Sequence, residues 1–238
     1  MCTGWLALGI VFSFTRAAWV SLAAAGALWI LMLAGVRMKA LLVAGLGALV
    51  VLAFSWDSLF IQLERNKQDS SDDLAKHVES ISNVSSDDSN LERLNRWSCA
   101  WAMFVERPIA GWGPGTYQFE YAPFQTAELR TKISTNNADL GNAHSEYLGP
   151  LAEQGLLGFS AMVALLLAAC HVGFKLHRTL TEPDERALAM GLFLGLVTYF
   201  VHGVLNNYLD TDKASAPFWG FLAMMVVMDL QSNRESTA

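Results

Sequence analysis

Six stretches of the chain are almost free of charged residues. They cover residues 1–15, 17–36, 40–56, 154–174, 187–209 and 214–228. A membrane-spanning helix needs roughly 20 apolar residues, with about 17 as the lower limit. Four stretches reach that length, whereas 1–15 and 214–228 are shorter and are either spans or re-entrant or buried helices. The pattern predicts an all-α membrane protein with five to six transmembrane helices and one long, partly helical loop.

This pattern divides the chain into four segments. Residues 1–56 hold about three predicted transmembrane helices, the first one short, and residues 154–230 hold about three more. Residues 57–153 form the long polar loop, and residues 231–238 form a tail. Within the loop, 67–90 is rich in Ser, Asp and Asn and is predicted to be flexible, because it has little apolar surface to bury. Its two Ser-Ser-Asp-Asp repeats favour solvated turns and helix caps over metal ligands, so no metal site is predicted.

The charge distribution supports the same division. The chain is 53% apolar and 16% charged, whereas a soluble domain carries about a quarter charged residues. The loop holds 15 of the 22 acidic residues and 8 of the 16 basic ones. The net charge of −6 argues against a nucleic-acid partner, because a phosphate-binding face should be basic. Of three cysteines only Cys99 lies in the loop, so no internal disulfide framework is expected.

Basic residues near the ends of the predicted spans indicate the orientation. Arg37 and Lys39 lie between the second and third stretches, Lys175 and Arg178 follow the fourth, and Arg234 follows the last. Loops rich in Lys and Arg stay on the cytoplasmic side of a membrane. The tail is therefore predicted to be cytoplasmic and the loop 57–153 to be periplasmic.

A helix is predicted from about Leu91 to Glu106. Its apolar stripe includes Trp101, with further aromatic residues beside it, and this composition suits a membrane interface. Arg93 and Arg96 lie on a neighbouring stripe. Pro108 should end the helix, because a residue before proline disfavours helical dihedrals. Glu92 has capping-box spacing from Ser89.

Three glycines follow within five residues, at Gly111, Gly113 and Gly115. They predict a tight turn, which either brings backbone N–H groups close to a partner or simply connects two elements. Further on, Gly155 and Gly158 have the small-x-x-small spacing of closely packed helices.

Two residues could carry chemistry by their position alone. His144 is flanked by polar residues just before an apolar stretch, where a histidine can act as a base near neutral pH or can be purely structural. Arg16 interrupts an otherwise uncharged region, where an arginine either reaches toward lipid headgroups or pairs with an anion such as phosphate.

Five short segments occur in order along the chain. They are Ser13-Phe14-Thr15-Arg16-Ala17, Arg93-Leu94-Asn95-Arg96-Trp97, the run from Arg107-Pro108 through Gly111, Gly113 and Gly115 to Tyr117, Ala143-His144-Ser145-Glu146-Tyr147-Leu148, and Ala152-Glu153-Gln154-Gly155-Leu156-Leu157-Gly158. Together they resemble the motifs of the O-antigen ligase and polymerase superfamily of bacterial membrane glycosyltransferases. The resemblance runs from about residue 5 to residue 225. Thr15 and Ala17 around Arg16, and Ser145 after His144, depart from the usual residues. Family members usually have more spans, so the chain corresponds to their C-terminal half.

The resemblance implies transfer of a glycan from a polyprenyl-pyrophosphate carrier to an acceptor hydroxyl, at the periplasmic face of the bacterial inner membrane, as in lipopolysaccharide biosynthesis. His144 would be the catalytic base. Arg16 and Arg93 would bind the pyrophosphate, with Arg96 as the spare cation, and Arg16, Arg93 and His144 would meet at one membrane boundary. Pro108, Gly111, Gly113, Gly115, Glu153 and Gly155 would shape the loop. No cofactor or metal is implied, and the acceptor is a glycan, a lipid or a protein.

Alternative functions remain at this stage. A polysaccharide polymerase or a protein O-oligosaccharyltransferase would differ only in its acceptor. A transporter of lipid-linked saccharides would place its polar groups near the bilayer midplane. The polar candidates here lie at the ends of spans and in the loop, which favours the enzyme over the transporter. An inactive fragment is the remaining possibility.

Overall fold

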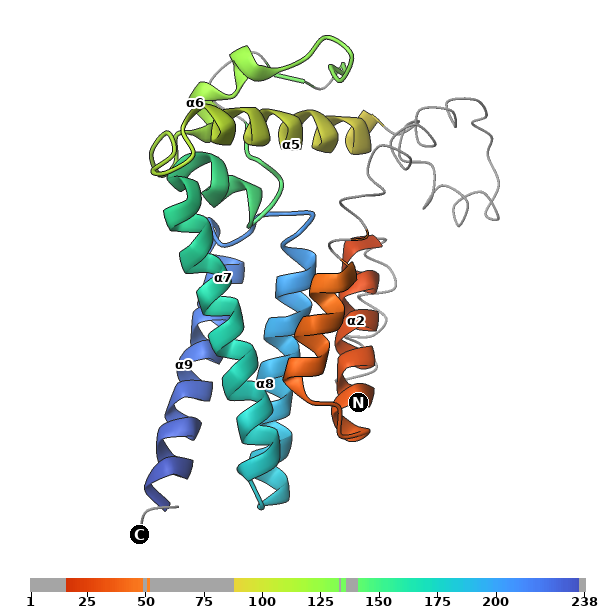
Figure 1. Cartoon of the computed structure of the whole chain (residues 1–238), viewed down its shortest axis with the longest axis vertical. Coiled ribbons are helices and arrows are strands. Elements are labelled where there is room, and N and C mark those ends of the chain that lie inside the picture. Colours follow the sequence, from red (N-terminus) through yellow and green to blue (C-terminus); the bar gives the residue numbers. More distant parts are fainter. Residues whose placement is uncertain (1–15, 49–50, 52–87, 133, 136–140, 236–238) are drawn as a thin grey trace, which may run out of the picture. The chain divides into compact units, whose positions relative to one another are not determined.

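The computed structural model describes residues 16–48, 51, 88–132, 134–135 and 141–235. This part of the chain forms helices and turns without any strand, so the all-α prediction is confirmed for it (Figure 1). The chain divides into two compact units. We call Met1–Met38 with Ser160–Ala238 the bundle unit, and Lys39–Phe159 the loop unit.

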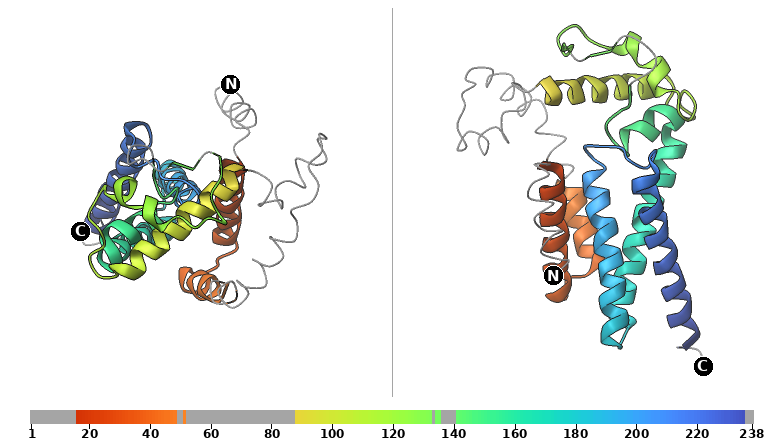
Figure 2. Two further views of the ribbon diagram at one scale, coloured as in Figure 1. Left: turned by 90° about the horizontal axis from the view of Figure 1, so that it is seen from above. Right: turned by 180° about the vertical axis from the view of Figure 1, so that it is seen from behind.

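The bundle unit is built from long apolar helices. They are α2 (Arg16–Leu33), α8 (Pro183–His202), α9 (Asp212–Glu235) and the part of α7 (Leu148–Thr179) that follows Phe159. Helix α8 packs against both α2 and α9 (Figure 2). Its Phe193 is fully buried and meets the Phe174 ring at a centroid distance of 6.0 Å. A Cβ at Gly173 would lie 2.5 Å from the Phe193 ring, so the absence of a side chain there allows this packing.

Local sequence explains where these helices begin and end. Gly35 has φ +77, and its N–H donates to the Met32 carbonyl over 3.0 Å. The Val36 N–H donates to the Leu31 carbonyl over 3.0 Å, and together these bonds form the Schellman motif that ends α2. Helix α8 begins with Pro183. Proline has no N–H, but the N–H groups of the first helical turn have no acceptor within the helix, so the helix loses no hydrogen bond there.

Among the described residues, two helices are long and apolar enough to cross a membrane, namely Leu148–Thr179 and Asp212–Arg234. Only 17% and 11% of their apolar windows are buried, so most of their apolar surface faces outward. Ala17–Leu33 and Met38–Ala48 are shorter apolar helices. The count of five to six spans stays a prediction, and the stretch 1–15 lies outside the described residues.

The loop unit has a small core beneath α5 (Asp88–Glu106). Two short helices, α6 (Tyr117–Glu120) and η1 (Ala122–Phe124), and the first turns of α7 complete it. The buried apolar residues of this core are Cys99, Ala100, Met103, Tyr117, Tyr121, Ala143 and Ala152. The rings of Tyr117 and Tyr121 stack at 5.3 Å, which joins two successive turns of the chain beside α5.

The ends of α5 and α7 can be compared with the sequence. Helix α5 ends at Glu106, as the Arg107-Pro108 pair predicts. It begins at Asp88, so the last three residues of the stretch 67–90, predicted to be flexible, are helical, and 67–87 lies outside the described residues. Helix α7 begins at Leu148, six residues before the apolar stretch that predicts a span from 154.

Candidate active site at the start of helix α7

Helix α7 is interrupted at Gly155, which has φ 62 and ψ −153. In a continuous helix, the N–H groups of Leu156 and Leu157 would donate to the carbonyls four residues earlier, at Ala152 and Glu153. Here the Leu156 N–H donates to the Pro108 carbonyl over 2.8 Å, and the Leu157 N–H donates to the Ile109 carbonyl over 3.4 Å. The kink therefore takes its acceptors from the segment after α5.

The same segment also supplies the missing donors. The Trp112 N–H donates to the Ala152 carbonyl over 3.2 Å, and the Gly113 N–H donates to the Glu153 carbonyl over 2.7 Å. The four backbone groups released by the kink are thus all bonded to residues 108–113. Pro108, Gly111 and Gly113 form an interlock with α7, which we call the 108–113 interlock.

Glu153 extends the interlock through its side chain. One carboxylate oxygen accepts from the Gly115 N–H over 2.9 Å, and the other accepts from the Tyr117 N–H over 2.9 Å. The Tyr117 hydroxyl in turn donates to the Arg96 carbonyl on α5 over 2.7 Å. The Gly115 N–H therefore faces a carboxylate of the same chain, whereas the Gly113 N–H faces the Glu153 backbone carbonyl and the Gly111 N–H faces the Arg107 carbonyl. This geometry fits a structural role for the turn.

Two glycines of the interlock are required by space as well as by dihedral angle. Gly111 has φ +65, and a Cβ there would lie 2.3 Å from the Glu153 carbonyl carbon. A Cβ at Gly155 would lie 2.4 Å from the Ile109 carbonyl oxygen. Gly115 has φ +74 but open space around it, so only its dihedral angle favours glycine.

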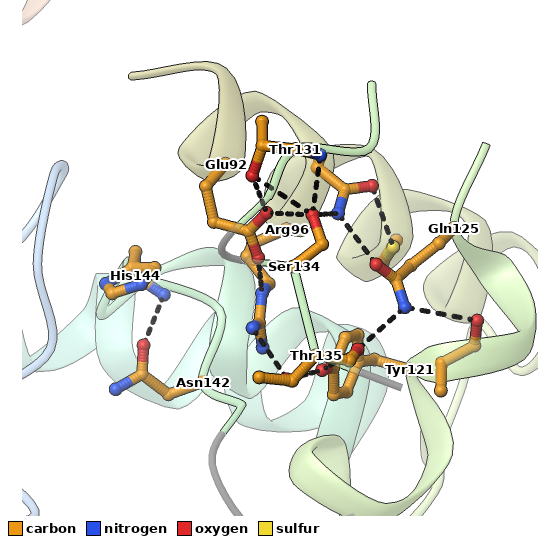
Figure 3. Close-up of polar contacts among 12 residues, drawn as sticks. Glu92, Arg96, Tyr121, Gln125, Thr131, Ser134, Thr135, Asn142 and His144 are labelled. Atoms are coloured by element: carbon orange, nitrogen blue, oxygen red, sulfur yellow. Dashed lines mark hydrogen bonds and ion pairs between the residues drawn. The ribbon is translucent and has the colours of Figure 1, made fainter. Parts of the chain in front are cut away.

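His144 lies just before α7 in a backbone conformation that is rare for a side-chain-bearing residue. Its φ is 47, and no other non-glycine residue in the described part of the chain has a positive φ. The Asn142 side-chain oxygen accepts from the His144 N–H over 3.1 Å (Figure 3). The Trp97 indole N–H donates to the His144 carbonyl over 3.5 Å. Such strained residues cluster at functional sites. Ser145, buried beside it, accepts from the N–H groups of Tyr147 and Leu148 and so caps α7.

The surroundings of His144 lower the pKa of its imidazole and so favour the neutral form. Burial lowers its pKa, and the positive charges of Arg93 and Arg96 lower it further. Glu92 acts in the opposite direction but does not outweigh them. A neutral imidazole can accept a proton, and the Arg93 cation is close enough for its charge to act on the ring.

Arg96 is at the centre of a buried polar network on α5. Its Nε donates to a Glu92 carboxylate oxygen over 2.6 Å, and its Nη2 donates to the Thr135 hydroxyl over 3.1 Å (Figure 3). Its guanidinium carbon lies 4.2 Å from the centre of the Tyr121 ring. Its Nη1 is buried close to Gly141, without a hydrogen-bond partner in the described part of the chain. Arg96 is 4% exposed, so its guanidinium is largely engaged inside the unit.

Glu92 connects this arginine to the segment 131–135. Its second oxygen accepts from the hydroxyls of Thr131 and Ser134. Burial alone would raise the pKa of the Glu92 carboxyl, but the bonds from Ser134 and Arg96 outweigh it and lower the pKa. The network fixes Thr131, Ser134 and Thr135 against α5. The capping-box spacing assigns Glu92 to the start of the helix, whereas its carboxylate is engaged here.

The predicted site residues therefore fall into three groups. His144 and Arg93 lie within electrostatic reach of one another, and Arg96 is held in the internal network. Pro108, Gly111 and Gly113 form the 108–113 interlock with Glu153 and Gly155 of α7, and Gly115 bonds to the Glu153 side chain. Arg16 is the first residue of α2 in the bundle unit, and its predicted meeting with Arg93 and His144 stays a prediction.

Some participants could not be identified as such from the sequence. Asn142 and Trp97 hold the backbone of His144, and Tyr121 faces Arg96. The Glu92–Arg96 spacing of four residues is a usable signal for an ion pair on one helix face. Burial raises the pKa of the Cys99 thiol to about 11, which makes it a poor nucleophile. Among the described residues, no group of three or more His, Cys, Asp or Glu side chains could hold a metal ion.

Comparison with known proteins gives one match. No curated protein and no solved structure matches the chain. A family model, Wzy_C, described as O-antigen ligase, matches residues 2–163, which is more than half of the chain and includes the interlock and the surroundings of His144. The resemblance seen in the motifs is therefore confirmed, and the chain belongs to the O-antigen ligase family.

Proposed function

We propose that the chain transfers a glycan from a polyprenyl-pyrophosphate carrier to an acceptor hydroxyl at the periplasmic face of the inner membrane. The family is one of bacterial inner-membrane enzymes of the ligase or polymerase type, with lipid-linked glycans and their acceptors as partners. The observation that carries the proposal is the state of His144. Its backbone is strained, and burial and the nearby Arg93 cation lower the pKa of its imidazole.

The proposed step needs one base and one cation. The acceptor oxygen bonds to the anomeric carbon of the donor sugar, and its proton passes to the His144 imidazole. The bond between the anomeric carbon and the pyrophosphate oxygen breaks, and the diphosphate leaves with the electron pair. Arg93 stabilises the negative charge that develops on this leaving group, because a guanidinium donates two hydrogen bonds to a phosphate at once. Arg16 is the proposed second cation for the same diphosphate.

Arg96 has a different role in this proposal. Its ion pair with Glu92 and its contact with the Tyr121 ring hold it inside the loop unit. Arg96 acts as a positioning residue that fixes α5, the helix that contains Arg93 and Trp97. Trp97 donates to the His144 carbonyl, so the position of α5 determines the position of the base.

Replacement of His144 by Gln tests the proposal. We expect turnover to fall by roughly 10²–10⁴-fold, the usual contribution of a general base, with little change in donor affinity. The measurement is glycan transfer in membranes of a strain that lacks its own ligase, with lipid, glycan and protein acceptors supplied in separate reactions. His171→Gln on the exposed side of α7 is the matched control and should leave turnover unchanged. Normal turnover of His144→Gln would exclude His144 as the base.

A further inference from the structure

An exposed apolar surface on the loop unit is used neither by the interlock nor by the proposed chemistry. Its residues are Trp101 (56% exposed), Val105 (60%), Ile109 (69%), Leu156 (49%) and Leu157 (66%). We call these five residues the apolar edge. Trp101 and Val105 are four residues apart on α5 and so share one helix face. Isolated exposed apolar residues are ordinary, but five joined ones indicate an interaction surface.

Backbone hydrogen bonds join the chain segments that carry the apolar edge. The Leu157 N–H donates to the Ile109 carbonyl, and the Leu156 N–H donates to the carbonyl of the preceding Pro108. Ile109 follows α5 by three residues, so the interlock joins the end of α5 directly to α7 just after its kink. The edge therefore begins on α5 and ends on α7.

This continuity indicates what covers the edge. Leu156 and Leu157 begin the long apolar part of α7, one of the two helices in the described part of the chain that are long and apolar enough to cross a membrane. In a bilayer every backbone polar group needs a partner, and the interlock bonds all four groups that the kink releases. A kink satisfied in this way is suited to the depth at which a helix enters lipid.

The opposite side of α5 shows that the helix is amphipathic in place. Glu92, Asn95, Arg96, Cys99 and Met103 are buried against the rest of the loop unit. The outward side carries Trp101, whose ring lies 5.3 Å from that of Phe104. Aromatic residues of this kind are enriched at the boundary between headgroups and acyl chains.

We infer that the apolar edge rests in the interface of the lipid bilayer and anchors the C-terminal half of α5 at headgroup depth. The anchor holds the helix that carries Arg93 and Trp97 beside the membrane surface. A donor attached to a lipid presents its reacting group at that depth. This anchoring requires only the exposed apolar edge and its connection to α7, so it does not depend on which reaction the protein performs.

Spin labels on single cysteines test the inference in the full chain. Cys2 and Cys170 are replaced by Ser, whereas buried Cys99 stays, because burial and its raised pKa keep it from reacting. Val105→Cys, Ile109→Cys and Leu157→Cys sample the edge. Leu167→Cys on the exposed side of α7 is the lipid control, and Ala127→Cys in an exposed loop of the same unit is the water control.

The protein is reconstituted in phosphatidylethanolamine–phosphatidylglycerol vesicles, and collisions with oxygen and with a water-soluble nickel complex are compared. We expect edge labels to favour oxygen, with values between those of Leu167→Cys and Ala127→Cys. Values equal to those of Ala127→Cys would overturn the inference. Spectral broadening at the edge that disappears on dilution with unlabelled protein would also overturn it, because it would show a second copy of the chain in place of lipid.

Discussion

At the scale of single residues, the charges around His144 determine when it can work as a base. A general base acts in its neutral form, so activity rises as the pH increases through its pKa. Burial, followed by the charges of Arg93 and Arg96, holds the pKa of His144 below its usual value near 6.5, and Glu92 opposes them. The acidic limb of the pH profile should therefore lie below pH 6.5.

Substitutions of Arg93 should move that limb in a predictable direction. Arg93→Gln removes a positive charge, so the pKa of His144 should rise and the limb should move to higher pH. Arg93→Lys keeps the charge, so the limb should stay in place while activity falls partly with the loss of the planar fork. The measurement is kcat/KM against pH for both variants. An unchanged limb in Arg93→Gln would show that its charge does not act on the base.

The Glu92–Arg96 pair should contribute to stability instead of direct chemistry. Both side chains are buried, and Glu92→Gln leaves the Arg96 cation without its charge partner, at a cost of roughly 3–5 kcal/mol. The double variant Glu92→Gln with Arg96→Met should be less destabilised than Glu92→Gln alone. Thermal melting in detergent measures both effects, and equal melting temperatures for the parent and Glu92→Gln would refute the expectation.

The same pair has a defined pH dependence. The pKa of Glu92 is lowered in the folded protein, so its contribution is present above the unfolded value near 4.5. It is lost as the pH falls through the lowered pKa of the folded state. The difference in melting temperature between the parent and Glu92→Gln should therefore shrink under strongly acidic conditions.

At the scale of elements, the interlock makes a prediction about its glycines. Gly111→Ala and Gly155→Ala add both backbone strain, about 1–3 kcal/mol, and a clash with backbone atoms that cannot move aside. Gly115→Ala adds the strain alone, because the space around it is open. Gly220→Ala in α9 adds neither and should be neutral or slightly stabilising. The melting temperature should fall most for Gly111→Ala and Gly155→Ala, less for Gly115→Ala, and not at all for Gly220→Ala. Equal losses of melting temperature for Gly111→Ala and Gly115→Ala would contradict the close approach of Gly111 to the Glu153 backbone.

The sequence predicts some element boundaries and misses others for identifiable reasons. Pro108 ends α5 through a local steric rule, so its effect could be predicted. The start of α7 at Leu148 could not be located from hydropathy. The first turns of the helix precede the apolar stretch and contain the charged Glu153, so hydropathy marks the helix only from residue 154. The interlock requires knowledge of which carbonyls lie near Gly155. Three glycines predict a turn, but they do not reveal the partner that the turn contacts.

The candidate site shows the same limit. The positions of His144 and Arg93 as site residues come from motif order, and the electrostatic effect of Arg93 on His144 places the two residues near each other. The roles of Arg93 and Arg96 could not be separated on the sequence, since both lie on α5 three residues apart. Burial separates them, because Arg96 faces Glu92 and Tyr121 in the interior, whereas Arg93 is only partly buried.

At the scale of the whole molecule, orientation in the membrane is the property that the proposed function most depends on. Donor transfer outside the cytoplasm requires the loop unit to face the periplasm, and the basic residues Arg37, Lys39 and Arg178 predict this orientation. Lys175 is engaged within the bundle unit, where it pairs with Asp229 at 2.7 Å, so it contributes less to this argument.

Two cysteines introduced at exposed positions test the orientation. We expect Ala127→Cys in the loop unit to react with a membrane-impermeant thiol reagent in intact spheroplasts. Thr181→Cys, in the turn between α7 and α8, should react only after lysis, because the neighbouring Arg178 predicts a cytoplasmic location for that turn. Buried Cys99 remains unreactive in both preparations. The opposite labelling pattern would place His144 and Arg93 in the cytoplasm, where a glycan already carried across the membrane on its lipid could not reach them.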